Sequence, residues 1–524
     1  MYRGKKTAMK NNDAELSSSP LSNIHPPARE WQEWMIEADI TAMQQEMEQG
    51  NLTSEQLTRL YLERINRYDG LLHAVLEINP DAQEIARRLD QERRDKGIRS
   101  PLHGIPVLVK DNIATSDKLH TSAGALALAD YRAAEDAVVI NKLRAAGAVI
   151  LGKANMTEWA NFMSPTMWAG YSSRGGLVLN PYGPGELFVG GSSSGSAAAV
   201  AANLAAVALG TETSGSIICP AAQNSLAGIK PTWGLVSNAG IIPGIGSQDT
   251  AGPMARTVSD AALLLSIIAG TGEHPHRASS DGTAGRQDYT ASLDIEYVKS
   301  KRIGIPRFYY KDLDEEALLL MESAIAVLKE LGAEVIDPIE LPCQNAEWNA
   351  VILQYEFKKG LNRYLSGLPA SIPVHSLQEL IEFNNLHSAQ ALKYGQGTLE
   401  WLDTSGDEIT EQEYLEQLQF SRSMAGRQGI DYALEHYGLD AIMFAGFHGT
   451  DLAARAGYPL ITVPAGYTTT GITAPGGYIT NGPQGVTFSA SAFSEAVLIG
   501  IAYSFEQATK HRRPPLLDTA GEAD

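Results

Sequence analysis

The spacing of hydrophobic positions changes twice along the chain, at about residue 100 and at about residue 345. Before the first change, Leu57 and Leu60 recur at helical spacing after the sequence TSEQ at 53–56, which is typical of a capping box and predicts a helix. Between about 100 and 265, short apolar runs at 106–109 and 148–151 alternate with helical patterns and glycine-rich turns. This alternation predicts parallel strands buried between helices.

Further strands are predicted on both sides of a long helical stretch. Residues 302–306 precede this stretch and have the apolar pattern of a strand. The apolar runs at 441–444 and 460–464 follow it. The stretch itself, about 345–435, has mostly helical patterning. The helical stretch is therefore interpreted as an insertion into a sheet built from both sides of it.

The whole pattern predicts one large α/β domain over residues 29–515, with a mixed, mostly parallel sheet covered by helices. No proline- or serine-rich linker divides the chain after residue 100, which favours a single unit. Residues 1–28 are polar and rich in serine and asparagine, so we predict a mobile tail there.

The net charge limits which partners the chain can bind, and the number of cysteines indicates the cellular compartment. The 524 residues carry a formal charge of 41 − 61 = −20, which opposes binding to nucleic acid and to anionic membranes. The two cysteines, Cys219 and Cys343, are too few for a disulfide framework or a four-cysteine zinc site. The N-terminus has no apolar run typical of a secretory signal, and we expect a protein of the reducing cytoplasm.

A lysine at the end of an apolar strand is the first candidate for chemistry. It is Lys110, in the sequence HGIPVLVKDN at 103–112. An amine at this place is poorly solvated, which lowers its pKa and allows it to act as a neutral base near pH 7. A lysine that reaches the surface or pairs with Asp111 is the alternative at this point.

Two runs of glycine and serine follow, GGSSSGSA at 190–197 and GTETSGSI at 210–217. Small residues let the backbone pack closely and leave N–H groups free to face an anion, as an oxyanion hole requires. Each run taken alone is also compatible with a plain turn.

The first of these runs also fits an esterase. Residues 191–195 match G-x-S-x-G with Ser193 in the centre, between a short apolar run and a helical stretch, as in a nucleophile elbow. Such an enzyme needs an acid and a histidine further along the chain, and Asp440 with His448 is the suggestive pair.

Taken together, the motifs resemble the amidase signature family. The resemblance rests on HGIPVLVKDN, GGSSSGSAAAVAA, GTETSGSI and SQDTAGPMARTVSDAA, and it extends from about residue 35 to 512. Ser216 follows Ser192 by 216 − 192 = 24 residues, as the two catalytic serines of that family do. The forms GGSSSGSA and GTETxGSIxCPA are most similar to bacterial peptide amidases, which remove the C-terminal amide from peptides.

This resemblance implies a Ser-cisSer-Lys triad, with Ser216 as the nucleophile that forms an acyl-enzyme, Ser192 as the proton relay and Lys110 as the base. It places the oxyanion beside the backbone N–H groups of Thr213, Ser214, Gly215 and Ser216. Ser193 is then a supporting hydrogen-bond donor, and the candidates for orienting Lys110 and the serines are Asp111, Ser194 and Ser196. Acyl transfer to water needs no metal and no organic cofactor.

The sequence therefore predicts a serine amidase that hydrolyses a linear carboxamide, either a small molecule or a peptide, with peptide C-terminal amides as the first choice. The alternative is a glutaminase similar to the glutamine-hydrolysing component of tRNA amidotransferases, which needs a second protein and a tRNA-bound substrate. Ser214 and Ile218 depart from many relatives and are expected beside the bound acyl group. The helical insertion at 345–435 is expected to build the substrate pocket.

Overall fold

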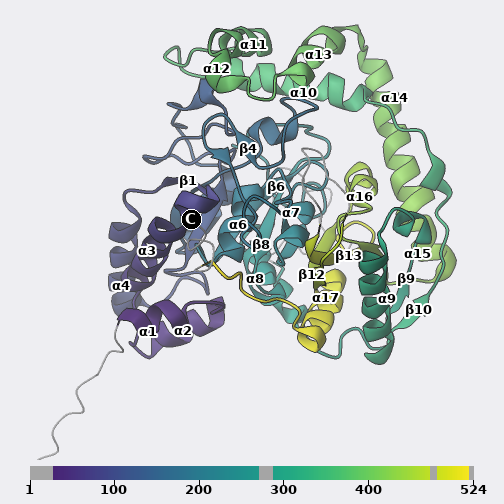
Figure 1. Cartoon of the computed structure of the whole chain (residues 1–524), viewed down its shortest axis with the longest axis horizontal. Coiled ribbons are helices and arrows are strands. Elements are labelled where there is room, and N and C mark those ends of the chain that lie inside the picture. Colours follow the sequence, from purple (N-terminus) through teal and green to yellow (C-terminus); the bar gives the residue numbers. More distant parts are fainter. Residues whose placement is uncertain (1–27, 271–286, 472–480, 518–524) are drawn as a thin grey trace, which may run out of the picture.

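The computed structural model describes residues 28–270, 287–471 and 481–517 (Figure 1). The predicted tail at 1–28 lies outside these residues except for its last position. Within the described chain, eleven strands form one sheet. In spatial order they are β1 (Val75–Ile78), β3 (Val149–Ala154), β2 (Pro106–Lys110), β6 (Val207–Glu212), β8 (Thr250–Ala255), β7 (Ala227–Lys230), β12 (Leu460–Thr468), β13 (Gly482–Ser489), β11 (Ala441–Ala445), β9 (Arg302–Gly304) and β10 (Glu334–Ile336).

The sheet is mixed, and its parallel pairs form two blocks. One block is β3-β2-β6 and the other is β11-β9-β10. Between them β8, β7, β12 and β13 alternate in direction, so antiparallel pairs outnumber parallel ones among the described strands. The α/β class, the mixed sheet and the helical cover are confirmed, and the antiparallel centre is a feature that hydrophobic runs alone do not reveal.

Helices cover the sheet closely enough to bury six of its strands at every residue. All residues of β2, β3, β6, β7, β8 and β11 are buried, which explains why these strands have apolar runs instead of alternation. The packing helices are α5 (Val138–Ala145), α6 (Ser194–Ala201), α7 (Ile218–Gln223), α8 (Val258–Ile268), α9 (Glu315–Glu330) and α17 (Glu495–Thr509).

Four helices form the N-terminal flank in Figure 1: α1 (Ala28–Trp34), α2 (Ile40–Glu48), α3 (Ser54–Leu72) and α4 (Ala82–Lys96). The predicted capping box is confirmed. The Thr53 hydroxyl accepts from the backbone N–H of Gln56, and the Gln56 side chain accepts from the N–H of Thr53. Leu57 and Leu60 are buried on the inner face of α3.

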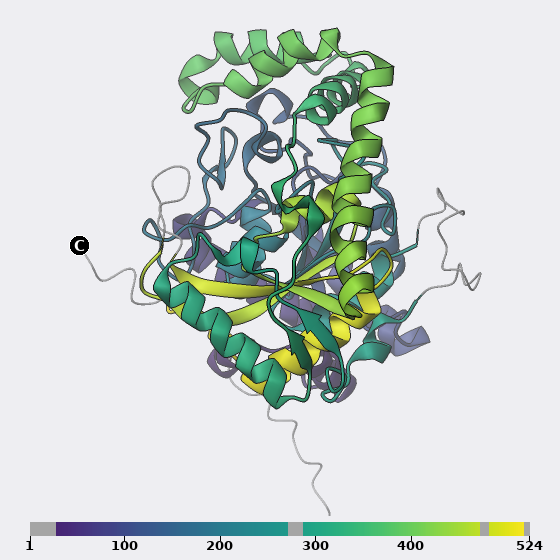
Figure 2. The ribbon, with the colours of Figure 1, turned by 90° about the vertical axis from the view of Figure 1, so that its right-hand side faces the viewer.

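The stretch predicted as a helical insertion is helical in the structure. It contains α10 (Val351–Ser366), α11 (Leu377–Leu386), α12 (Ser388–Ala391), α13 (Gly397–Ser405), α14 (Glu411–Arg422), a π-helical segment (Ser423–Ile430) and α15 (Asp431–Tyr437). Figure 2 shows α10 to α13 as a layer above one end of the sheet, with α14 running down beside it. Their apolar side chains form a second core with the segment after β3, where the rings of Phe162 and Phe357 lie 5.0 Å apart.

The remaining described elements are short. They are the hairpin β4 (Tyr171–Ser172) and β5 (Gly176–Leu177), the helix α16 (Thr450–Ala456) and several 3-10 helices of three or four residues. Among the described residues we find no helix with the length and apolar character needed to cross a bilayer. Cys219 and Cys343 are both buried free thiols.

Candidate active site

The side chain of Lys110 is wholly buried at the end of β2. Its Nζ donates hydrogen bonds to the hydroxyl oxygen of Ser192 at 2.8 Å and to the carbonyl oxygen of Thr211 at 3.0 Å. Burial lowers the pKa of Lys110 to about 7, although the negative charges of Asp249 and Glu212 oppose this shift. The amine therefore exchanges its proton close to neutral pH.

Ser192 lies in a tightly packed loop before α6. A cis peptide bond joins Gly191 to Ser192, and the Ser192 carbonyl accepts from the backbone N–H of Thr157 at 3.0 Å. A Cβ atom at Gly191 would lie 2.6 Å from the Thr157 hydroxyl, so the loop requires glycine there. The loop thus fixes the Ser192 hydroxyl against Lys110.

The three other serines of this loop hold it to its neighbours. The Ser193 hydroxyl donates to the Thr211 carbonyl at 3.1 Å and accepts from the Thr211 N–H at 3.2 Å. The Ser196 hydroxyl donates to the Leu209 carbonyl at 3.0 Å, and the Ser194 hydroxyl donates to the Gly190 carbonyl at 2.6 Å. Ser193 and Ser196 therefore tie α6 to β6.

These contacts contradict the esterase alternative. Ser193 is wholly buried, and its hydroxyl is occupied by backbone groups of β6. Asp440 accepts hydrogen bonds from the Lys301 amine at 3.2 Å and from the Arg302 N–H at 2.8 Å. Its carboxylate is therefore engaged at the start of β9, and the proposed Ser193–Asp440–His448 set is wrong.

Ser216 lies in the loop between β6 and α7. Its carbonyl accepts from the Ser193 N–H at 3.1 Å, which places the second serine loop directly against the first. Ser216 is 7% exposed, whereas Lys110 and Ser192 are 0% exposed. Of the three residues, Ser216 alone has a part of its surface exposed.

The loop before Ser216 has free backbone donors. Within the described part of the chain, the N–H groups of Thr213, Ser214, Gly215 and Ser216 donate no hydrogen bond to another protein atom. Buried polar backbone groups in folded proteins are normally paired. Gly215 and Ser216 are buried and Thr213 and Ser214 are partly exposed, so these four N–H groups remain available to a bound molecule.

Three carboxylates shape this loop from outside. The Thr213 hydroxyl donates to Asp249 at 2.5 Å, and the Ser214 hydroxyl donates to Asp451 of α16 at 2.6 Å. Glu212 accepts from the backbone N–H groups of Ile217 at 2.7 Å and Ile218 at 3.0 Å. Ser214 therefore faces Asp451, and the backbone of Ile218 is part of the turn that holds Ser216.

Asp249, Glu212 and Asp451 have no role in the site predicted from the sequence. Asp249 stands in the motif SQDTAGPMARTVSDAA and Glu212 in GTETSGSI, so their motifs are visible in the sequence but their contacts are not. Asp451 is 237 positions from Ser214, and nothing in the local sequence indicates their hydrogen bond.

The contacts of Asp111 differ from the expectation that it orients Lys110. Its carboxylate accepts from the Ser122 hydroxyl, from the Gly124 N–H at 2.9 Å and from the Arg174 guanidinium at 3.3 Å. Burial raises the pKa of Asp111. Successive side chains of an extended chain point to opposite sides, so the Asp111 carboxylate points away from the Lys110 amine. Its hydrogen bonds hold the turn at 122–124 instead.

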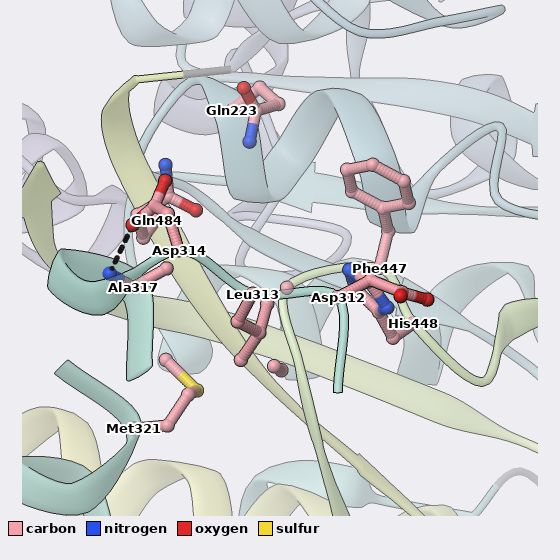
Figure 3. A pocket seen from close by; sticks show the side chains of 11 residues that line it. Gln223, Asp312, Leu313, Asp314, Ala317, Met321, Phe447, His448 and Gln484 are labelled. Atoms are coloured by element: carbon pink, nitrogen blue, oxygen red, sulfur yellow. Dashed lines mark hydrogen bonds between the residues drawn. The ribbon is translucent and has the colours of Figure 1, made fainter. Parts of the chain in front are cut away.

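A separate pocket lies between the loop after β11, the start of α9 and β13 (Figure 3). Phe447 on one side of it also packs against Phe188 and Cys219. Gln223 at the end of α7 and Gln484 on β13 face it from above in Figure 3, and His448 lies in the same loop as Phe447. The pocket therefore adjoins the helix that follows Ser216 without including Lys110, Ser192 or Ser216.

In the described residues, no group of three or more His, Cys, Asp or Glu side chains could hold a metal ion.

The fold and the site define a hydrolase, and the chain belongs to the amidase family, whose model matches residues 56–499. It is an amidohydrolase that acts on C–N bonds. A probable amidase of Arabidopsis thaliana is 42% identical over 491 residues, which cover 91% of each chain.

Two further relatives bear on the substrate. The solved structure of native peptide amidase from Stenotrophomonas maltophilia has a TM-score of 0.82 and 43% identity, and the match covers 92% of this chain and 99% of that chain. A glutamyl-tRNA(Gln) amidotransferase component of Chromohalobacter salexigens is 34% identical over 503 residues, 91% of this chain and 97% of the relative.

Proposed function

We propose that the chain is a serine amidase in which Ser216 attacks a linear carboxamide, with Ser192 as the proton relay and Lys110 as the base. The observation that carries this proposal is the 2.8 Å hydrogen bond between the Lys110 amine and the Ser192 hydroxyl, in an interior where the pKa of the amine falls to about 7. A serine hydroxyl is a weak nucleophile until a base removes its proton.

The proton path follows from the valence of a neutral amine. When Lys110 is neutral, one N–H stays on the Thr211 carbonyl. The 2.8 Å contact with Ser192 then reverses its direction, so that the hydroxyl donates and the lone pair of the amine accepts the proton. Ser192 in turn takes the proton of Ser216 as the Ser216 oxygen bonds to the carbonyl carbon. The same path returns a proton to the leaving nitrogen as the C–N bond breaks, and water then hydrolyses the acyl-enzyme.

The free N–H groups from Thr213 to Ser216 are the donors for the negative oxygen of the tetrahedral intermediate in this proposal. One donor of this kind contributes about 3 to 4 kcal/mol to the transition state in comparable enzymes. Asp249 and Asp451 hold the side chains of Thr213 and Ser214, so the loop is already shaped before substrate binds.

The C-terminal amide of a peptide is our proposed substrate. The likeness to the Stenotrophomonas peptide amidase over 92% of this chain supports it, as do the GGSSSGSA and GTETxGSIxCPA motifs. We also propose that α10 to α13 form one wall of the substrate pocket, because their core includes Phe162 and Trp159 from the segment that leads toward Ser192.

The similarity to a glutamyl-tRNA(Gln) amidotransferase component supports a second candidate, a glutaminase that works within a larger complex. The two functions differ in what the purified chain does alone. Release of ammonia from peptide amides and short aliphatic amides, and of aniline from anilides, should be measured without any partner, beside free glutamine.

We expect the parent chain to release ammonia fastest from peptide amides, and the Ser216→Ala variant to release none above background. Activity on glutamine alone, or dependence on an added protein, would favour the glutaminase. A variant that changes a hydroxyl outside the proposed pocket, Ser300→Ala, serves as the matched control, because this side chain is exposed in the turn before β9.

A further inference from the structure

A small cavity lies behind the loop from Thr211 to Thr213, on the side of the base. It is enclosed by the end of β6, by Asn112 two positions after Lys110, and by the segment that carries Asn238 and Asp249. Neither Ser192 nor Ser216 lines it. The cavity is thus a neighbour of the proposed triad and shares Thr213 with the proposed oxyanion loop.

Three side chains on its wall each have a buried oxygen without a hydrogen-bond partner among the described residues. They are the Oδ1 atoms of Asn112 and Asn238 and the Oε1 atom of Glu212. Asn112 is 4% exposed and Glu212 is 1% exposed, whereas Asn238 is partly exposed and only its Oδ1 atom is enclosed. Buried polar atoms are nearly always paired, and three orphaned oxygens on one cavity point to an occupant that donates hydrogen bonds.

The other atoms of these side chains are already engaged, which fixes the free oxygens as acceptors. The Asn112 amide nitrogen donates to the Thr211 hydroxyl at 3.0 Å, and the Asn238 amide nitrogen donates to the Asp249 carbonyl at 2.6 Å. The second oxygen of Glu212 accepts from the N–H groups of Ile217 and Ile218. The cavity therefore offers acceptors and two carboxylates, those of Glu212 and Asp249.

Size and charge then limit the occupant. The cavity measures about 20 Å³, which suits one particle the size of water and excludes an alkylamine. These two carboxylates also act on the charge of Lys110, and when that amine is neutral they favour a cation over a neutral molecule. A small cation with several N–H bonds satisfies the volume, the charge and the three acceptors together.

We propose that this cavity binds one ammonium ion, with hydrogen bonds to Asn112, Glu212 and Asn238. The choice of ammonium rests on the proposed function, because hydrolysis of a primary amide releases this nitrogen and the cavity adjoins the loop that leads to Ser216. Ammonium ions added to the solution should therefore fill the site, and their binding can be measured without an amide substrate.

The test is calorimetric titration of the purified full chain with ammonium chloride, potassium chloride and tetramethylammonium chloride in a constant sodium chloride background. We expect saturable binding of ammonium and none of tetramethylammonium, which is too large. Asn238→Leu should weaken ammonium binding about tenfold or more, since it removes one acceptor. Asn238→Asp keeps an oxygen and adds charge, so it should bind at least as tightly as the parent. Asn51→Leu, on the exposed surface, is the matched control.

Three results would overturn the site. If ammonium chloride gives no heat of binding with the parent chain, water is the occupant. If potassium binds with the same affinity, hydrogen-bond donation has no role in the selection of the ion. If Asn238→Leu binds ammonium as tightly as the parent, the ion binds elsewhere. Circular dichroism confirms that the variants are folded, and Asn238→Asp carries the test if Asn238→Leu is not. Ammonium binding by a chain that cleaves no amide would refute the proposed function and leave the site standing, whereas amide hydrolysis without ammonium binding would refute the site alone.

Discussion

The amine nitrogen of Lys110 lies 2.8 Å from the hydroxyl oxygen of Ser192, and both side chains are wholly enclosed by protein. The enclosure sets the acid–base behaviour of the pair, because the charged amine loses the hydration that stabilises it in water. The pKa of about 7 that follows makes this pair sensitive to pH near neutrality.

The first prediction is a rise of activity with pH. Only the neutral amine of Lys110 accepts a proton, and its fraction falls tenfold for each pH unit below the pKa. We expect kcat/KM on a peptide amide to rise with a midpoint at about pH 7 and to level off about one pH unit above it. A profile that stays flat between about pH 5 and about pH 9 would contradict the base role of Lys110.

Substitution of the base should not be rescued by another cation. Lys110→Ala should lower kcat by about 10⁴-fold or more, as loss of a catalytic base does in related chemistry. Lys110→Arg should be as inactive as Lys110→Ala, because a guanidinium does not become neutral in this pH range. Recovery of activity in the arginine variant to within about tenfold of the parent would reject the mechanism.

The two serine loops predict opposite outcomes for neighbouring hydroxyls. Ser216→Ala should abolish the acyl-enzyme, detected by mass spectrometry with a slow substrate, and should change the free energy of unfolding by less than about 1 kcal/mol. Ser193→Ala should instead lower stability by about 1 to 3 kcal/mol, because the backbone groups of Thr211 lose a buried partner. Normal acyl-enzyme formation in Ser216→Ala would remove this residue as the nucleophile.

Asp249 should act on both the base and the oxyanion loop. Its charge raises the pKa of Lys110, so Asp249→Asn should move the rise in kcat/KM to lower pH. Its hydrogen bond to Thr213 shapes the loop, so the same variant should also lower kcat by about 10- to 100-fold.

Thr213→Val separates these two effects of Asp249. It removes the hydrogen bond but leaves the carboxylate, so the rate should fall while the pH at which activity rises stays where it is in the parent. A shift of the profile in Thr213→Val as large as in Asp249→Asn would show that charge is not the cause.

The sequence predicts the residues of the proposed site better than their contacts. Lys110, Ser192 and Ser216 are visible because each stands in a motif whose residue types suit one task. The turn of Asp111 toward Arg174 and the pairing of Ser214 with Asp451 depend on segments brought together by the fold. Local pattern carries no information about such partners.

The same limit applies to the sheet. Apolar runs at 106–109 and 148–151 correctly predict β2 and β3 and their parallel pairing. They do not predict that β8 and β7 run antiparallel to their neighbours. A strand that is buried on both faces has the same continuous apolar pattern whether its neighbours are parallel or antiparallel. Direction is set by the length and course of the connections, which hydrophobicity does not record.

The carbonyl of Thr211 accepts hydrogen bonds from both Lys110 and Ser193, and Thr211 belongs to β6, inside the sheet. The proposed base and the Ser193 loop are therefore held by a strand that is buried at every residue, and not by an exposed loop. Heating should leave catalysis intact until the whole domain melts, and enzyme inactivation and loss of secondary structure should share one midpoint.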